Sequence, residues 1–168
     1  MYKLRELKKT DIPIINLWRN NKNLIDFLGA PFRYINEDVD YNWYNNYLDS
    51  RSNNIRCSIV NEDDIVVGLI SILSIDYINQ TGVLNVMIGD SNNYNKGIGS
   101  FAIKKIIEHA FNNLNLRRIE LEALESNTRA RHVYEKIGFI KEGVKRKAVY
   151  KNGKFVDVVM YAILKDEF

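Results

Sequence analysis

A short glycine-bearing segment, set between an apolar run and an amphipathic helix, constrains this chain more than any other feature. The segment reads Tyr94-Asn95-Lys96-Gly97-Ile98-Gly99-Ser100 and follows the strand-like run 83–88. Glycines at such a junction let the backbone turn and approach a ligand closely. The first N–H groups of the new helix then point into the same space, with the positive end of the helix dipole behind them. The arrangement favours a pyrophosphate site built mostly from backbone, although glycine at a helix start also serves purely steric roles.

A second segment, about thirty residues further along, carries a short helix with a glycine stop. It spans residues 127–139, and its pattern Asn-x-x-Ala-x-x-x-Tyr-x-x-x-Gly-Phe is matched at Asn127, Ala130, Tyr134, Gly138 and Phe139. In this order and at this separation, the two segments together resemble the GNAT superfamily of acetyl-CoA-dependent N-acetyltransferases. Toward the C-terminus the sequence also resembles the RimJ/RimL-like branch of that superfamily, which has similar residues at the positions of Gly138-Phe139, Glu142-Gly143, Arg146, Gly153, Asp157 and Met160.

The resemblance implies that acetyl-CoA is the co-substrate. No pair of Cys and His residues has metal-ligand spacing, so no metal is expected. In the family, the glycine loop binds the pyrophosphate and the strand before it holds the pantetheine and the acyl oxygen. Carried onto this sequence, the predicted cofactor-binding residues are Met87, Ile88, Tyr94, Asn95, Lys96, Gly97, Ile98, Gly99, Ser100, Asn127 and Arg129. Asn95 stands where the branch often has glycine. The replacement is tolerable if this residue has a positive φ, because asparagine adopts that conformation more readily than most other residues.

The resemblance also suggests catalytic groups. Tyr134 is the expected general acid, because a phenol with an ordinary pKa of about 10 is protonated at neutral pH and can serve a thiolate leaving group. Packing of the ring against the sheet is the alternative role for Tyr134. The strand before the glycine loop lacks the glutamate that some relatives use as a base. Glu122 on the next strand is therefore the candidate base, and a solvated strand-face charge is its alternative role.

The acceptor site is the least defined part of the sequence. Phe32, Arg33 and Tyr34 follow Pro31 in an irregular loop and are the predicted substrate-binding residues. The expected reaction is direct attack on acetyl-CoA by a primary amine, either a protein N-terminus or a small molecule. A polyamine or an amino sugar is the alternative acceptor, and a non-catalytic CoA-binding sensor is the alternative of another class. The basic net charge of +3 argues against a polycationic substrate.

Composition sets the remaining bounds. The 168 residues are 46% hydrophobic and 27% charged, which is typical of a single globular domain over 1–168. Cys57 is the only cysteine, so no intrachain disulfide can form. No signal-like or membrane-spanning run is evident, and the expected location is cytoplasmic. The basic residues from Lys141 to Lys154 are typical of a solvated face, and the chain lacks aromatic-basic motifs of the kind that stack bases. No nucleic-acid partner is therefore expected, whereas a homodimer remains open.

Hydrophobic periodicity predicts the element order β, α, α, β, β, β, α, β, α, β, β. The principal strands are expected at 65–75, 83–88 and 118–124, and the principal helix from Gly97 onward. The segment 24–34 is expected to be irregular, and Asn152-Gly153 to turn a terminal hairpin. The fold class is therefore α/β with a mixed sheet. The resemblance makes it a GNAT fold, with a twisted, mostly antiparallel sheet of about seven strands and about four helices, splayed at the acetyl-CoA site.

Overall fold

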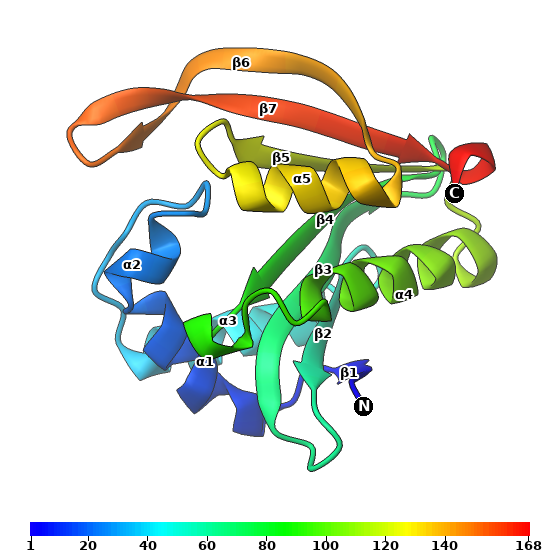
Figure 1. Cartoon of the computed structure of the whole chain (residues 1–168). Coiled ribbons are helices and arrows are strands. Elements are labelled where there is room, and N and C mark those ends of the chain that lie inside the picture. Colours follow the sequence, from blue (N-terminus) through cyan, green and yellow to red (C-terminus); the bar gives the residue numbers. More distant parts are fainter.

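The computed structural model describes residues 1–168 and contains one seven-stranded sheet with helices on both faces (Figure 1). The strand order is β1-β2-β3-β4-β5-β7-β6, and only β4 and β5 run parallel. This mixed α/β fold confirms the predicted GNAT architecture. The elements are β1 Lys3–Glu6, α1 Ile12–Arg19, α2 Lys22–Ile25, α3 Glu37–Asp49, β2 Ile55–Val60, β3 Val66–Asp76, β4 Thr81–Ile88, α4 Ile98–Asn113, β5 Arg118–Leu124, α5 Thr128–Ile137, β6 Ile140–Lys151 and β7 Lys154–Leu164.

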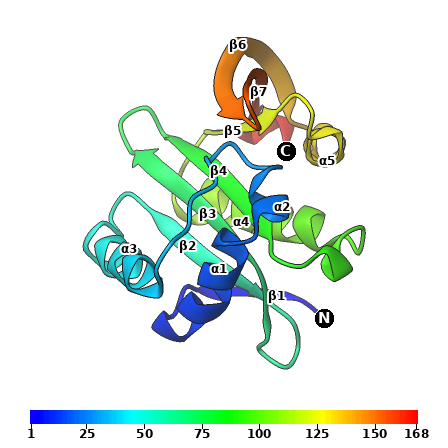
Figure 2. The same cartoon turned by 90° about the vertical axis from the view of Figure 1, so that its left-hand side faces the viewer.

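The two faces of the sheet carry different cores. Helices α4 and α5 cover one face and bury the larger cluster, which includes Ile103, Ile107 and Phe139. Helices α1 and α3 cover the other face, where Trp18 and Tyr47 belong to a smaller cluster (Figure 2). Strand β3 carries mostly apolar side chains on both faces, as suits a strand that lies inside the sheet and is covered from both sides. None of the helices has the length and apolar character needed to cross a lipid bilayer.

One expected irregular region is partly helical. Residues Lys22–Ile25 form the single turn α2, capped by the Asn21 side chain, which accepts hydrogen bonds from the N–H groups of Asn23 and Leu24. Five α-helices are therefore present instead of about four. The local signal was too short for helical periodicity to emerge, and the turn is stabilised by burial of Leu24 and Ile25.

A buried carboxylate joins β1, β2 and the start of α1. Asp11 is 3% exposed, and its carboxylate accepts two hydrogen bonds from the Arg5 guanidinium, one from the Ser58 hydroxyl and one from the Lys8 N–H. These bonds outweigh the cost of burying the charge and lower the pKa of Asp11 below its ordinary 3.8.

We expect Asp11→Asn to lower the free energy of unfolding by about 3 kcal/mol at pH 7, because Arg5 and Ser58 lose their charged partner. A carboxyl group whose pKa is lower in the folded than in the unfolded state stabilises the fold fully at pH values above its unfolded-state pKa. This stabilisation is lost as the pH falls through the folded-state pKa. The difference in free energy of unfolding between wild type and variant should therefore shrink as the pH is lowered. Urea titrations at several pH values measure it, with the exposed Asp63→Asn as a charge-matched control; equal losses in both variants would contradict the assignment.

Candidate functional site

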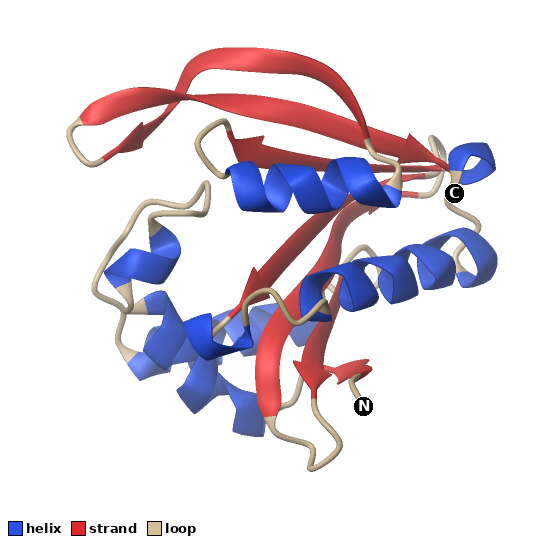
Figure 3. Ribbon diagram, viewed as in Figure 1, coloured by secondary structure: helices blue, strands red, loops and turns tan.

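The sheet opens between β4 and β5. These parallel strands pair only over Thr81–Val83 with Arg118–Glu120, and beyond these residues they diverge toward their carboxyl ends (Figure 3). Two cavities occupy the opening. We call them the loop cavity, which lies against the glycine loop, and the strand cavity, which lies against the face of the sheet that carries α1 and α3. They share Phe27, Leu28, Val86, Met87, Asn127 and Tyr134, so they form one continuous site.

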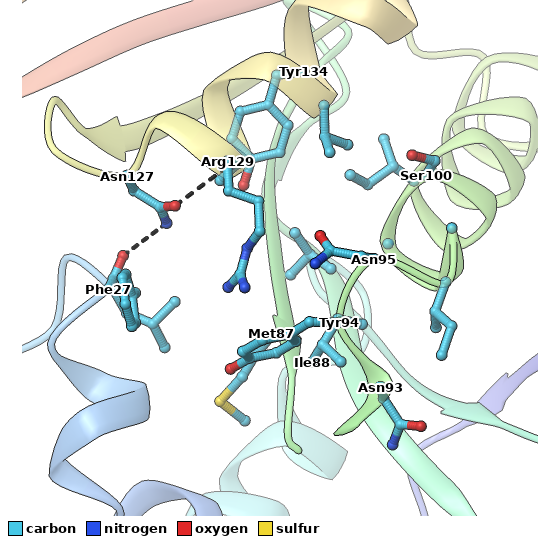
Figure 4. A pocket seen from close by; sticks show the side chains of 18 of the residues that line it. Phe27, Met87, Ile88, Asn93, Tyr94, Asn95, Ser100, Asn127, Arg129 and Tyr134 are labelled. Carbon is cyan, nitrogen blue, oxygen red and sulfur yellow. Dashed lines mark hydrogen bonds between the residues drawn. The ribbon is translucent and has the colours of Figure 1, made fainter. Parts of the chain in front are cut away.

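The loop cavity has a volume of about 160 Å³ and lies between the end of β4, the glycine loop and the start of α5 (Figure 4). Ten of the eleven residues predicted to bind the cofactor line it. These are Met87, Ile88, Tyr94, Asn95, Gly97, Ile98, Gly99, Ser100, Asn127 and Arg129. The eleventh, Lys96, is exposed and does not line the cavity, so its role as a phosphate contact remains a prediction.

The backbone of the glycine loop is shaped to receive an anion. Asn95 has φ +61° and Gly97 has φ +75°, which confirms the positive φ expected of Asn95. Helix α4 begins directly after Gly97, and none of the N–H groups of residues 95–100 donates a hydrogen bond within the chain. Free N–H groups at the positive end of a sixteen-residue helix suit a phosphate or pyrophosphate group.

Two side chains at the start of α5, from the N-cap Asn127 and from Arg129, border the same cavity. The side-chain oxygen of Asn127 accepts a hydrogen bond from the Ala130 N–H and caps the helix. The side-chain NH₂ group of Asn127 donates to the backbone carbonyl of Phe27 at 3.0 Å. The Arg129 guanidinium lies 3.8 Å from the centre of the Tyr94 ring and 5.7 Å from that of Phe27. It therefore places a positive charge at the cavity without an acidic partner.

Tyr134 points from α5 toward β4 and lines both cavities (Figure 4). The residue is 8% exposed, and burial, reinforced by Tyr161, raises the pKa of its phenol to about 12. Its hydroxyl makes no hydrogen bond within the chain and is not a fully enclosed atom. The hydroxyl of neighbouring Tyr161, in contrast, donates to Glu135 and accepts from Arg131. The packing role of Tyr134 is thus real, but it leaves a protonated hydroxyl free at the junction of the cavities.

The strand cavity has a volume of about 530 Å³ and is mainly apolar. Its charged lining residues are Arg19, Arg56 and Glu122. Glu122 is half exposed and forms an ion pair with Lys145 of β6. Glu120, which shares a face with Glu122, lies where β4 and β5 are still paired and binds Arg118 instead.

The three residues predicted to bind the acceptor lie elsewhere. Phe32 packs edge-on against Tyr34, Arg33 is exposed, and Tyr34 is 91% exposed. None of them lines either cavity, so their substrate role remains a prediction without a supporting contact.

An earlier part of the same loop lines the site instead. Residues Phe27 and Leu28 border both cavities, and Gly29 and Ala30 border the strand cavity. The nearly buried Lys151 fixes this loop, because its ammonium donates to the carbonyl oxygens of Ile25 and Ala30. Sequence alone gave no signal for this contact, which spans more than a hundred residues along the chain.

Comparison with known proteins agrees with the fold and the site. Residues 2–140 match the family described as the acetyltransferase (GNAT) domain. The chain belongs to the GNAT acetyltransferases. It is therefore an N-acetyltransferase whose co-substrate is acetyl-CoA. No group of three His, Cys, Asp or Glu side chains is arranged to hold a metal ion.

Individual relatives share much of the chain. A spermidine N(1)-acetyltransferase of Vibrio cholerae is 26% identical over 98% of this chain and 94% of its own. A putative ribosomal N-acetyltransferase of Bacillus subtilis is 33% identical over 79% of this chain and 70% of its own. The crystal structure of the Vibrio cholerae spermidine N-acetyltransferase in complex with CoA and spermine superposes with a TM-score of 0.93 at 26% identity, covering 99% of this chain and 96% of that one.

The free N–H groups of the loop lead to a direct test. A Cβ at Gly99 would meet nothing within 4 Å, so Gly99→Asp should fold normally, whereas at Gly97 the positive φ would add strain. A carboxylate at the helix start should repel a pyrophosphate and weaken acetyl-CoA binding roughly 10- to 100-fold. Calorimetry measures the affinity, and Gly99→Ala separates the effect of size from that of charge. An unchanged affinity of the folded Asp variant would exclude the loop from the site.

Proposed function

We propose that this GNAT enzyme transfers the acetyl group of acetyl-CoA directly to a primary amine in a ternary complex. The observation that carries the proposal is the continuity of the two cavities, with the free Tyr134 hydroxyl at their junction. One cavity offers an anion-binding loop and the other an apolar compartment from the opposite face of the sheet. The thioester and the amine can therefore meet beside Tyr134 without a covalent enzyme intermediate.

The chain's own groups meet the proton requirements of the reaction. The new C–N bond forms as the C–S bond breaks, the nitrogen gives up a proton, and the sulfur takes one. Tyr134 remains protonated at neutral pH because burial raises its pKa to about 12, so it can donate to the departing sulfur. Free N–H groups at the end of β4, where β5 has diverged, are available to polarise the acyl oxygen.

Glu122 is our candidate for the group that receives the proton of the incoming ammonium. It is the only carboxylate that lines either cavity, and it borders the same cavity as Tyr134. Lys145 already occupies its carboxylate in an ion pair, so relay of the proton through water suits it better than direct contact with the acceptor. Phe32, Arg33 and Tyr34 would act only where a larger acceptor extends past the Phe27–Ala30 loop.

Within the family, we place the enzyme with the RimJ/RimL-like acetyltransferases, whose acceptor is a protein N-terminus or a small amine. The motif resemblance and the similarity to a putative ribosomal N-acetyltransferase support this assignment. A polyamine acceptor is the second candidate, because the similar Vibrio cholerae enzyme is a spermidine acetyltransferase whose structure holds spermine. Of the acidic residues that follow the loop, Asp40 is fully buried against Arg19 and Asn16, whereas Glu37 and Asp38 are exposed and line neither cavity.

We expect Tyr134→Phe to lower kcat about 10²- to 10⁴-fold while acetyl-CoA affinity stays close to that of the wild type. The ring and its packing remain, and only the proton donor is lost. Single-turnover kinetics measures the rate, and calorimetry measures the affinity. Tyr161→Phe provides a matched control, since its hydroxyl is engaged outside the site. Near wild-type turnover would show that solvent or another group protonates the thiolate, and absence of turnover with any amine in the wild type would favour a CoA-binding sensor.

Glu122→Gln keeps the size of the side chain and removes its basic oxygen. If Glu122 accepts the proton, the rate at neutral pH should fall, and higher pH should restore part of it because more acceptor is already neutral. The pH–rate profile of kcat/KM checks this expectation. Lys145→Gln, which removes the ion pair but keeps the carboxylate, should not reproduce the shift. Superimposable profiles of Glu122→Gln and wild type would exclude Glu122 as the general base. The close positioning of amine and thioester would then be the main source of catalysis.

A further inference from the structure

The strand cavity contains a positive charge that nothing in the chain neutralises. Arg56 lies on β2 and lines the cavity, with its guanidinium 4.6 Å from the centre of the Trp43 ring. No hydrogen bond or ion pair of the chain engages its side chain, and burial lowers its pKa from the ordinary value. A half-buried cation without an anionic partner costs folding free energy, which makes it a candidate for ligand recognition.

The other charges of the cavity are already paired. Arg19 forms an ion pair with the fully buried Asp40, and Glu122 pairs with Lys145. Trp43 lies near both Arg19 and Arg56, so it offers the Arg56 guanidinium a flat surface without neutralising it. Any acceptor in the cavity therefore meets an excess of one positive charge at Arg56.

Arg56 belongs to a polar row that crosses the floor of the cavity. The strand register pairs Arg56 with Ser71 and Ser71 with Asn85, so the three side chains share one face on β2, β3 and β4. All three line the strand cavity, and neither Ser71 nor Asn85 uses its side chain in a hydrogen bond of the chain. The row runs from the unpaired cation toward the opening between β4 and β5, where Tyr134 lies.

We propose that the acceptor is an amine that also carries a carboxylate, and that Arg56 binds this carboxylate with Ser71 and Asn85 as neutral partners. This inference rests on the proposed function of the site. A single guanidinium matches a singly charged, planar carboxylate in charge and geometry. A phosphate carries nearly twice the charge of a carboxylate, so the single Arg56 guanidinium would neutralise only about half of it. A polyamine would be repelled by Arg56 and would find Glu122 as the only cavity carboxylate.

The test compares acceptors that differ only in the carboxylate. 5-Aminovalerate and pentylamine form one pair, L-leucine and L-leucinamide form a second with a shorter spacing, and spermidine represents polyamines. Wild type, Arg56→Gln and the exposed Arg117→Gln, a charge-matched control, are assayed for kcat/KM. Calorimetry with the CoA-saturated proteins measures acceptor binding independently of turnover. Dividing the value of each variant by that of the wild type cancels the different amine pKa values of the acceptors.

The wild type should prefer the carboxylate member of at least one pair. Arg56→Gln should lower kcat/KM and binding for that member about 10- to 100-fold, mainly through KM, and change its neutral counterpart by less than about threefold. Arg117→Gln should change neither.

Equal losses for charged and neutral acceptors, or a preference for spermidine that Arg56→Gln does not reduce, would overturn the inference and leave the proposed function intact. Arg56-dependent binding without turnover of any amine would support the inference and overturn the proposed function. Absence of both binding and turnover would overturn both.

Discussion

The divergence of β4 from β5 is the constraint on which the rest of the site depends. A strand edge exposes N–H and C=O groups that must find partners, so an opening inside a sheet is stable only where other groups can satisfy them. Here the strands pair over three residues and then part. Helix α5 crosses the gap from one side and leaves the Tyr134 hydroxyl within it. The free edge of β4, the free N–H groups of the glycine loop and the free phenol thus all face one space, which is what a linear thioester requires.

The walls of that space are tied together by contacts between distant parts of the chain. The Asn127 amide binds the Phe27 carbonyl, and the Lys151 ammonium binds the carbonyls of Ile25 and Ala30. The loop over the cavities is consequently held by the start of α5 on one side and by the β6–β7 hairpin on the other. Burial lowers the pKa of Lys151, yet two carbonyl acceptors keep its ammonium satisfied. A displacement of the hairpin would therefore also displace the loop at Phe27 and Leu28, which lines both cavities.

The part of the site that could be predicted from sequence is the part that depends on local backbone conformation. The positive φ values of Asn95 and Gly97, the cap formed by Asn127 and the glycine stop at Gly138 are set within a few residues. The acceptor side depends on strand register and on contacts across the chain, which sequence patterns do not report. Arg56 reads only as a polar residue at the start of a strand, and its meeting with Trp43 follows from the packing of α3 on the sheet. Phe32, Arg33 and Tyr34 do not line the cavities for the same reason: Lys151 fixes the earlier part of the loop over the cavity. Their role in binding the acceptor stays a prediction.

This difference also explains why similarity to a solved structure transfers cofactor chemistry more readily than acceptor chemistry. A TM-score of 0.93 reports shared backbone, and the predicted cofactor site is made mostly of backbone. At 26% identity most side chains differ, and the charges of the strand cavity come from side chains, namely Arg19, Arg56 and Glu122. Arg19 and Glu122 are neutralised by partners outside the cavity, so the residue at position 56 decides whether the interior of the cavity carries a net charge. Because one unpaired charge can favour or repel an acceptor by a large factor in a partly desolvated site, acceptor class can change within this fold while the acetyl-CoA site stays the same.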